Sequence, residues 1–223
     1  MQNYISIFDV IGPNMIGPSS SHTAGAASMA LLARKLFAKE PVKVEFKLYG
    51  SFAQTYSGHG TDKALLGGVM GFHTDDVRIR DAFKVAESIG LEFSFTADKE
   101  TETDHPNTAD ITMYAADGTS QFVCGESIGG GKVKIVNING IDVEFTGEYS
   151  TLIVKQYDKP GVVAHLTTCL AEQNVNIAFM RLFREAKGET AYTIIESDHR
   201  IPDSIIDNII GHENIQETTV IQL

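Results

Sequence analysis

The segment Gly17–Thr23, with the sequence GPSSSHT, concentrates four hydroxyl groups and an imidazole at the start of a predicted helix. Free backbone N–H groups, the positive end of the helix dipole and serine hydroxyls together suit a carboxylate. His22 can carry a proton near neutral pH. A serine N-cap followed by an incidental surface histidine explains the same residues, and both interpretations stay open at this point.

A second candidate is the segment Gly58–Lys63, with the sequence GHGTDK. The glycines on both sides of His59 let the backbone approach a ligand or a partner closely. Thr61 or Asp62 is a candidate cap for the next helix. A flexible loop with a solvated histidine is the alternative. The segment 105–108 (HPNT) is typical of a turn before a strand, and the glycine-rich segment 125–132 has the wrong glycine–lysine spacing for a phosphate loop.

The elements that must position these residues indicate a mixed α+β fold for the first part of the chain. A helix is predicted over 20–39, with Gly25, Met29, Leu32 and Leu36 on one face. A strand over 42–49 and a glycine-rich loop follow. Further helices are predicted over 61–70 and 77–89, and further strands over 91–96, 111–115, 121–124, 133–138 and 141–145. The Asn139-Gly140 pair favours a tight hairpin turn.

The second part of the chain has a βαββαβ pattern, the split βαβ arrangement. We expect domains over 1–147 and 148–223. The strands are predicted at 152–154, 175–179, 191–196 and 218–223. One helix follows the turn Asp158–Gly161 and places Val163, Leu166 and Leu170 on one face, and a short helix covers 205–210.

Composition and charge narrow the class of protein. The 223 residues are 43% hydrophobic and 21% charged, as in ordinary globular proteins. A formal net charge of -11 makes nucleic acid a poor partner. No apolar run reaches the roughly 20 residues that span a bilayer, and the start of the chain is not typical of a secretory signal. We therefore expect a cytoplasmic protein. Cys124 and Cys169 predict buried, inert thiols, and two cysteines are too few to hold a cubane cluster.

The second part resembles an ACT domain, the small ferredoxin-like module found on many enzymes of amino-acid metabolism. The resemblance lies in the turn Asp158–Gly161 (DKPG), the helix after it and the segment Asn174–Ile177 (NVNI). It implies regulation or homodimerisation through this domain. It also makes Asp158 and Gly161 candidate effector-binding residues, and a tight turn that starts a helix is the alternative explanation of them.

The whole chain resembles the β portion of iron–sulfur L-serine dehydratases, to which the two-subunit members append an ACT domain. The motifs that carry this resemblance are FDVIGP at 8–13, GPSSSHT at 17–23, GHGTDK at 58–63, HPNT at 105–108 and SIGGG at 127–131. That β portion is similar in fold to the allosteric substrate-binding domain of some D-3-phosphoglycerate dehydrogenases. The resemblance therefore implies an allosteric-substrate-binding-like α+β domain followed by a βαββαβ ACT domain.

The implied reaction is β-elimination of L-serine, which yields aminoacrylate and then pyruvate and ammonia. The resemblance implies a 4Fe–4S cluster as the Lewis acid, held by the cysteines of a separate α subunit. We expect His22 and His59 to face that cluster at the subunit interface, one as the α-proton base and the other as an acid or substrate orienter. Ser19, Ser20, Ser21 and Thr23 would hold the serine carboxylate, and Asp62 and Lys63 would tune His59 or the substrate.

The sequence also leaves two alternative hypotheses about the function of the chain. A free-standing serine sensor would use the same hydroxyls without catalysis, although it needs no proton-transfer histidine. A regulatory fragment related to D-3-phosphoglycerate dehydrogenase would require a dinucleotide-binding domain, and the sequence has no G-x-G-x-x-G in a βαβ context.

Overall fold

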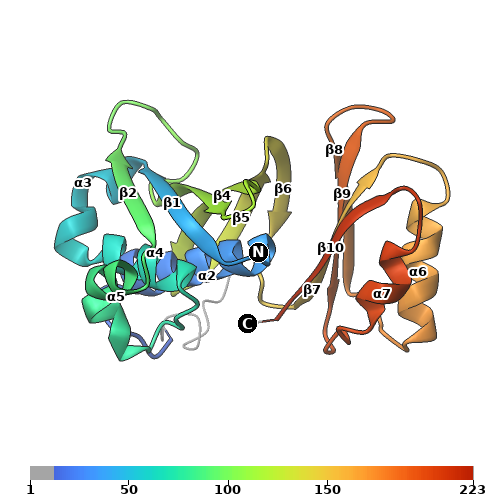
Figure 1. The fold of residues 1–223 in the computed structure, drawn as a ribbon, viewed down its shortest axis with the longest axis horizontal. Coiled ribbons are helices and arrows are strands. Elements are labelled where there is room, and N and C mark those ends of the chain that lie inside the picture. Colours follow the sequence, from blue (N-terminus) through green and yellow to red (C-terminus); the bar gives the residue numbers. More distant parts are fainter. Residues whose placement is uncertain (1–12, 223) are drawn as a thin grey trace, which may run out of the picture. The chain divides into compact units, whose positions relative to one another are not determined.

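The computed structural model describes residues 13–222, which form two compact units that divide between Asn139 and Gly140 (Figure 1). Residues 8–12 of the first motif and residue 223 of the predicted last strand lie outside the described residues. Within residues 13–222, no helix is long and apolar enough to cross a membrane. Asn139 and Gly140 have φ values of 52° and 87°, as the predicted tight turn requires. The predicted domain division after residue 147 stays a prediction.

The predicted N-terminal helix is present, but its first turn is wound more loosely than an α-helix. A π-helical segment, η1 (Ser20–Gly25), continues into α2 (Ala26–Phe37). Ser19 is extended, and its hydroxyl accepts the His22 N–H at 3.1 Å, so the serine cap is confirmed. Ala38 ends α2 in the left-handed conformation. The predicted inward face is buried at Gly25, Met29, Leu32 and Leu36.

The predicted glycine-rich loop after the first strand is wrong, because this segment forms the helix α3 (Gly50–His59). The next helix, α4 (Thr61–Val69), follows at once. The Pro106 carbonyl accepts the N–H groups of Ser51 and Phe52 at 2.7 and 3.4 Å, and the Phe52 ring is buried. A carbonyl from the distant HPNT turn therefore caps α3 and offsets the low helix propensity of its glycines.

A mixed sheet in the order β2-β1-β3-β4-β5-β6 supports these helices (Figure 1). β1 pairs with β2 in parallel and with β3 in antiparallel, which confirms the α+β class. α2 and α4 pack on each other so closely that a Cβ on Gly68 would lie 2.4 Å from the Ala27 carbonyl oxygen. The strands are β1 (Pro41–Leu48), β2 (Glu92–Ala97), β3 (Thr108–Ala115), β4 (Ser120–Gly129), β5 (Lys132–Ile138) and β6 (Ile141–Phe145). The remaining helices are η2 (Val77–Asp81) and α5 (Ala82–Ser88).

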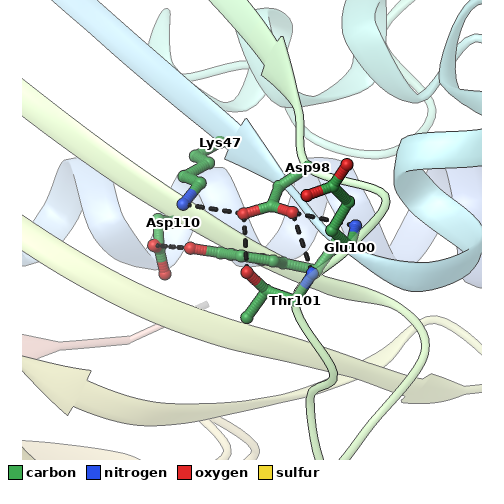
Figure 2. A network of polar contacts seen from close by, with 6 residues as sticks. Lys47, Asp98, Glu100, Thr101 and Asp110 are labelled. Atoms are coloured by element: carbon green, nitrogen blue, oxygen red, sulfur yellow. Dashed lines mark hydrogen bonds and ion pairs between the residues drawn. The ribbon is translucent and has the colours of Figure 1, made fainter.

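A polar network fixes the junction between β1 and α3, as Figure 2 shows. Lys47 pairs with Asp98 at 2.9 Å, and the Asp98 carboxylate also accepts the Thr101 N–H and hydroxyl. The Tyr49 hydroxyl donates to Asp110 at 2.6 Å. Burial, with the Asp110 carboxylate, raises the pKa of Tyr49 to about 12, so the phenol keeps its proton. The hydrogen bond from Tyr49, the residue before α3, to Asp110 ties the start of this helix to β3.

The second unit contains the predicted βαββαβ pattern, with its four strands in the order β10-β7-β9-β8. The observed bounds depart from the predicted ones, and the clearest differences are in the second strand and in the buried face of the first helix. The second strand starts at Phe179 rather than Val175, and the inward face of the first helix uses Val162, whereas Val163 is exposed. Leu166 and Leu170 are buried as predicted. The elements are β7 (Ser150–Tyr157), α6 (Val162–Glu172), β8 (Phe179–Arg184), β9 (Thr190–Ser197), α7 (Ile205–Ile210) and β10 (Ile215–Ile221).

Candidate active site

The two histidines singled out from the sequence lie next to each other, although 36 residues separate them along the chain. The ring centroids of His22 and His59 are 4.9 Å apart, with an angle of 77° between the ring planes. The Phe52 ring contacts His22 edge-on from another side at 5.3 Å. α3 therefore completes the pairing, because it carries both Phe52 and His59.

His22 is half-buried, and both of its ring nitrogens face hydroxyl groups. Its Nε2 lies 3.0 Å from the Ser51 Oγ, and its Nδ1 lies 3.5 Å from the Ser19 Oγ. Burial, with the neighbouring His59 ring, lowers the pKa of His22. The imidazole is therefore neutral near pH 7. Sequence reasoning missed Ser51, because a contact across 29 residues leaves no local pattern.

His59 is the last residue of α3, and its ring is exposed. The buried hydroxyl of Thr23 donates to the His59 carbonyl at 3.2 Å, which ties the end of α3 to the π-helix. Gly60 then turns the chain into α4 with a φ of 72°, where a side chain would be strained. Gly17 makes room for Thr23, because a Cβ on Gly17 would lie 2.3 Å from the Thr23 methyl group. The two glycine-bearing motifs are therefore interlocked.

A second contact, also missed from the sequence, holds the π-helix from the sheet side. The buried Ser127 hydroxyl donates to the Ser21 carbonyl at 2.9 Å. The Ser127 N–H donates to the Asn107 carbonyl of the HPNT turn. A Cβ on Gly25 would lie only 2.0 Å from the Ser127 Oγ, so a glycine at this position allows the approach. π-helical turns concentrate at functional sites, and this one places His22.

The two motifs meet at a cavity of about 280 Å³, formed by residues 16–18, 23, 57–60, 63 and 79–80. His59 lines this cavity, together with Lys63 of α4 and Arg80 of η2. Arg80 is a further residue that the sequence did not single out. Ser19, Ser20 and Ser21 are not among the lining residues, and their proposed contact with a substrate carboxylate stays a prediction.

Asp62 is buried at the start of α4, with 7% of its surface exposed. Its carboxylate accepts the Lys63 N–H at 2.8 Å, and burial raises its pKa. The side chain of Asp62 does not line the cavity, whereas Lys63 does. The structure therefore brings Lys63 beside His59 and leaves the predicted tuning role of Asp62 a prediction.

Comparison with known proteins gives a consistent result over nearly the whole chain. Residues 6–137 match the family model described as "Serine dehydratase beta chain", and residues 150–210 match the ACT domain model. The chain is 43% identical over 218 residues to the "Probable L-serine dehydratase, beta chain" of Bacillus subtilis and 39% identical to the "L-serine dehydratase, beta chain" of Peptoniphilus asaccharolyticus. Each alignment covers 98% of both chains. The chain belongs to the L-serine dehydratase beta-chain family.

As a member of this family, the chain is a subunit of an L-serine ammonia-lyase, which favours the enzyme over the free-standing sensor. The chain is also 27% identical over 187 residues to the D-3-phosphoglycerate dehydrogenase of Bacillus subtilis. That alignment covers 83% of the present chain and 35% of the dehydrogenase. The similarity agrees with the fold expected for the first domain.

In the ACT domain of this dehydratase subunit, the DKPG turn is part of the hairpin framework. The Asp158 carboxylate accepts the Gly188 N–H at 3.2 Å and an Arg184 Nη1 proton at 3.0 Å, and these contacts lower its pKa. Gly161 begins α6 with a φ of 94°. The polar atoms of Asp158 thus bind the β8–β9 turn, and effector binding by Asp158 and Gly161 stays a prediction.

The residues of this dehydratase subunit do not fit an iron–sulfur cluster. Cys124 belongs to the first unit and Cys169 to the second, and neither forms a disulfide bond. Burial raises the pKa of Cys169, so it is protonated and a poor ligand. Within residues 13–222, no group of three or more histidine, cysteine or acidic side chains converges to hold a metal ion.

Proposed function

We propose that this chain supplies the proton-transfer residues of an active site shared with an α subunit, in an αβ L-serine dehydratase that converts L-serine to pyruvate and ammonia. The single observation that carries the proposal is the ring contact between His22 and His59, of which His59 lines the cavity. The beta-chain relatives support an α partner. This chain has only two cysteines, which are too few to hold a cubane cluster. The proposal therefore assigns a 4Fe–4S cluster to that partner, where it would polarise the substrate oxygens as a Lewis acid.

His59 is the α-proton base in this proposal. Its ring lines the cavity, and no hydrogen bond to its ring nitrogens is present among residues 13–222. When neutral, it accepts the α-proton of serine, and the C–H electron pair becomes the new Cα=Cβ bond as the β-hydroxyl departs. The proton that His59 has taken then passes to the departing hydroxide, which leaves as water, and the aminoacrylate hydrolyses to pyruvate and ammonia.

His22 is a positioning residue in the same scheme. The Ser51 and Ser19 hydroxyls flank both of its ring nitrogens, and its lowered pKa keeps it uncharged beside His59. A neutral neighbour does not repel the imidazolium that forms when His59 takes the proton. The contact between the rings therefore orients the base without opposing its protonation.

The test uses the complex of this chain with its α partner, purified without oxygen. His59→Gln should lower kcat for L-serine by about 10²–10⁴-fold, the usual contribution of a general base, with an unchanged cluster absorption spectrum. His22→Gln should lower kcat less. His199→Gln is the matched control, because His199 is an exposed histidine of the second unit. Near-normal turnover of His59→Gln would refute the assignment of His59 as the α-proton base.

A further inference from the structure

Two cations in the cavity lack the acidic partners that most cations around them have. The Arg80 side chain forms no ion pair within 4 Å and no hydrogen bond within the described part of the chain. Lys63 acts through space on the carboxylates of Asp62 and Asp81, yet its Nζ has no ion pair within 4 Å there either. Both side chains nevertheless line the same cavity as His59.

The surrounding segment shows that acidic partners are close at hand. Arg78, two residues before Arg80, forms an ion pair with Asp76 at 2.6 Å and lies over the Phe72 ring. Asp81, the residue after Arg80, pairs with Lys84 at 2.9 Å. The charges of Arg78 and Asp81, on either side of Arg80, are therefore neutralised by local ion pairs. Of these three residues, only Arg80 lines the cavity.

The charge of the cavity is opposite to that of the chain. The lining residues include two cations and a histidine, and none of the described lining residues is Asp or Glu. The whole chain carries a formal net charge of -11. Two positive charges in a cavity lining that holds no carboxylate create a local field that favours a small anion. Arginine suits a carboxylate in particular, since its planar fork can donate two parallel hydrogen bonds.

The shape of the cavity agrees with a small substrate. Its volume of about 280 Å³ lies just below the usual range for ligand sites, roughly 300–1,000 Å³. Ile16 and Ile79 provide apolar walls. Gly58 adds open space, because a Cβ there would meet no other atom of residues 13–222 within 4 Å.

We propose that Arg80, with Lys63, binds the carboxylate of the substrate and so selects a 2-amino acid over its uncharged analogues. This role replaces the serine hydroxyls with guanidinium and ammonium groups as the main carboxylate ligands. It places the α-carbon beside His59, because all three side chains line one cavity. The inference rests on the proposed function and names the binding determinant of that same site.

The experiment compares two competitive inhibitors in the purified αβ complex, 3-hydroxypropionate and its neutral amide, 3-hydroxypropanamide. Arg80→Gln should raise KM for L-serine and Ki for 3-hydroxypropionate by about 10–100-fold, as expected for loss of hydrogen bonds to a charged group, and leave Ki for the amide within about twofold. Arg80→Lys should recover part of the loss. Lys99→Gln is the matched control, because Lys99 is an exposed cation of the same unit outside the cavity.

Equal weakening of both inhibitors in Arg80→Gln, or no change for either, would overturn the inference. Failure of the wild-type complex to deaminate L-serine would instead refute the proposed function. In that case, calorimetry with 3-hydroxypropionate still decides the role of Arg80. If 3-hydroxypropionate binds the wild-type complex and Arg80→Gln weakens this binding, the result supports the role of Arg80. If the compound does not bind the wild-type complex, or binds the wild-type and Arg80→Gln complexes equally, the result overturns that role.

Discussion

The closest approach in the site, that of Ser127 to Gly25, permits a quantitative test. In Gly25→Ala, the new Cβ would lie 2.0 Å from the Ser127 Oγ and 2.8 Å from its Cβ. Both residues are buried, so neither atom can turn toward solvent. The Ser127 hydroxyl would lose its hydrogen bond to the Ser21 carbonyl, and the π-helix that carries His22 would move away from β4.

Three contributions set the expected magnitude. Loss of the hydrogen bond costs about 1 kcal/mol, and overpacking of a buried contact costs about 1–3 kcal/mol. Alanine gains about 0.5–1 kcal/mol over glycine in a helix, which offsets part of the cost. We therefore expect Gly25→Ala to reduce the free energy of unfolding by about 1–3 kcal/mol in the wild-type background.

A double-mutant cycle isolates the contact. Ser127→Gly removes both atoms that the new methyl group would strike, so Gly25→Ala in that background should be neutral or slightly stabilising. The coupling free energy between the two positions should be about 1–3 kcal/mol. Urea-induced unfolding of the four chains, followed by circular dichroism, measures it. A Gly25→Ala cost that is equal in both backgrounds would refute the reasoning.

Two further predictions concern the histidine pair. Thr23→Val keeps the shape of the side chain but removes the hydrogen bond to the His59 carbonyl. It should therefore reduce the free energy of unfolding by about 1 kcal/mol and lower kcat. Thr23→Ser should retain the stability and the kcat of the wild type, and identical behaviour of the two variants would contradict this prediction. Because the folded chain lowers the pKa of His22 from its ordinary 6.5, the unfolded chain binds the proton more readily just below pH 6.5, and stability must fall there as the pH decreases. Urea midpoints between pH 8 and 5.5 should fall less steeply in His22→Gln than in the wild type, and parallel curves would argue against the assignment.

The sequence alone determined the features that depend on neighbouring residues. Ser19 caps the helix that carries His22 because the Ser19 hydroxyl and the His22 N–H lie only three residues apart. The turn at Asn139 and Gly140 forms because both residues tolerate positive φ. The βαββαβ order of the second unit followed from hydrophobic periodicity, which depends on each strand and helix separately. The absence of enough cysteines for a cluster was likewise a property of composition.

Only the tertiary structure decided how the chemistry is assembled. The sequence predicts a loop at the position of α3 because glycines disfavour a helix, and the Pro106 carbonyl supplies the cap that this helix needs. Ser127 reaches the Ser21 carbonyl across 106 residues, a separation that leaves no periodic signal in the sequence. Arg80 resembled any surface cation until the fold placed it with His59 around one cavity. Long-range packing, and not local propensity, therefore determines which of the polar residues face the cavity.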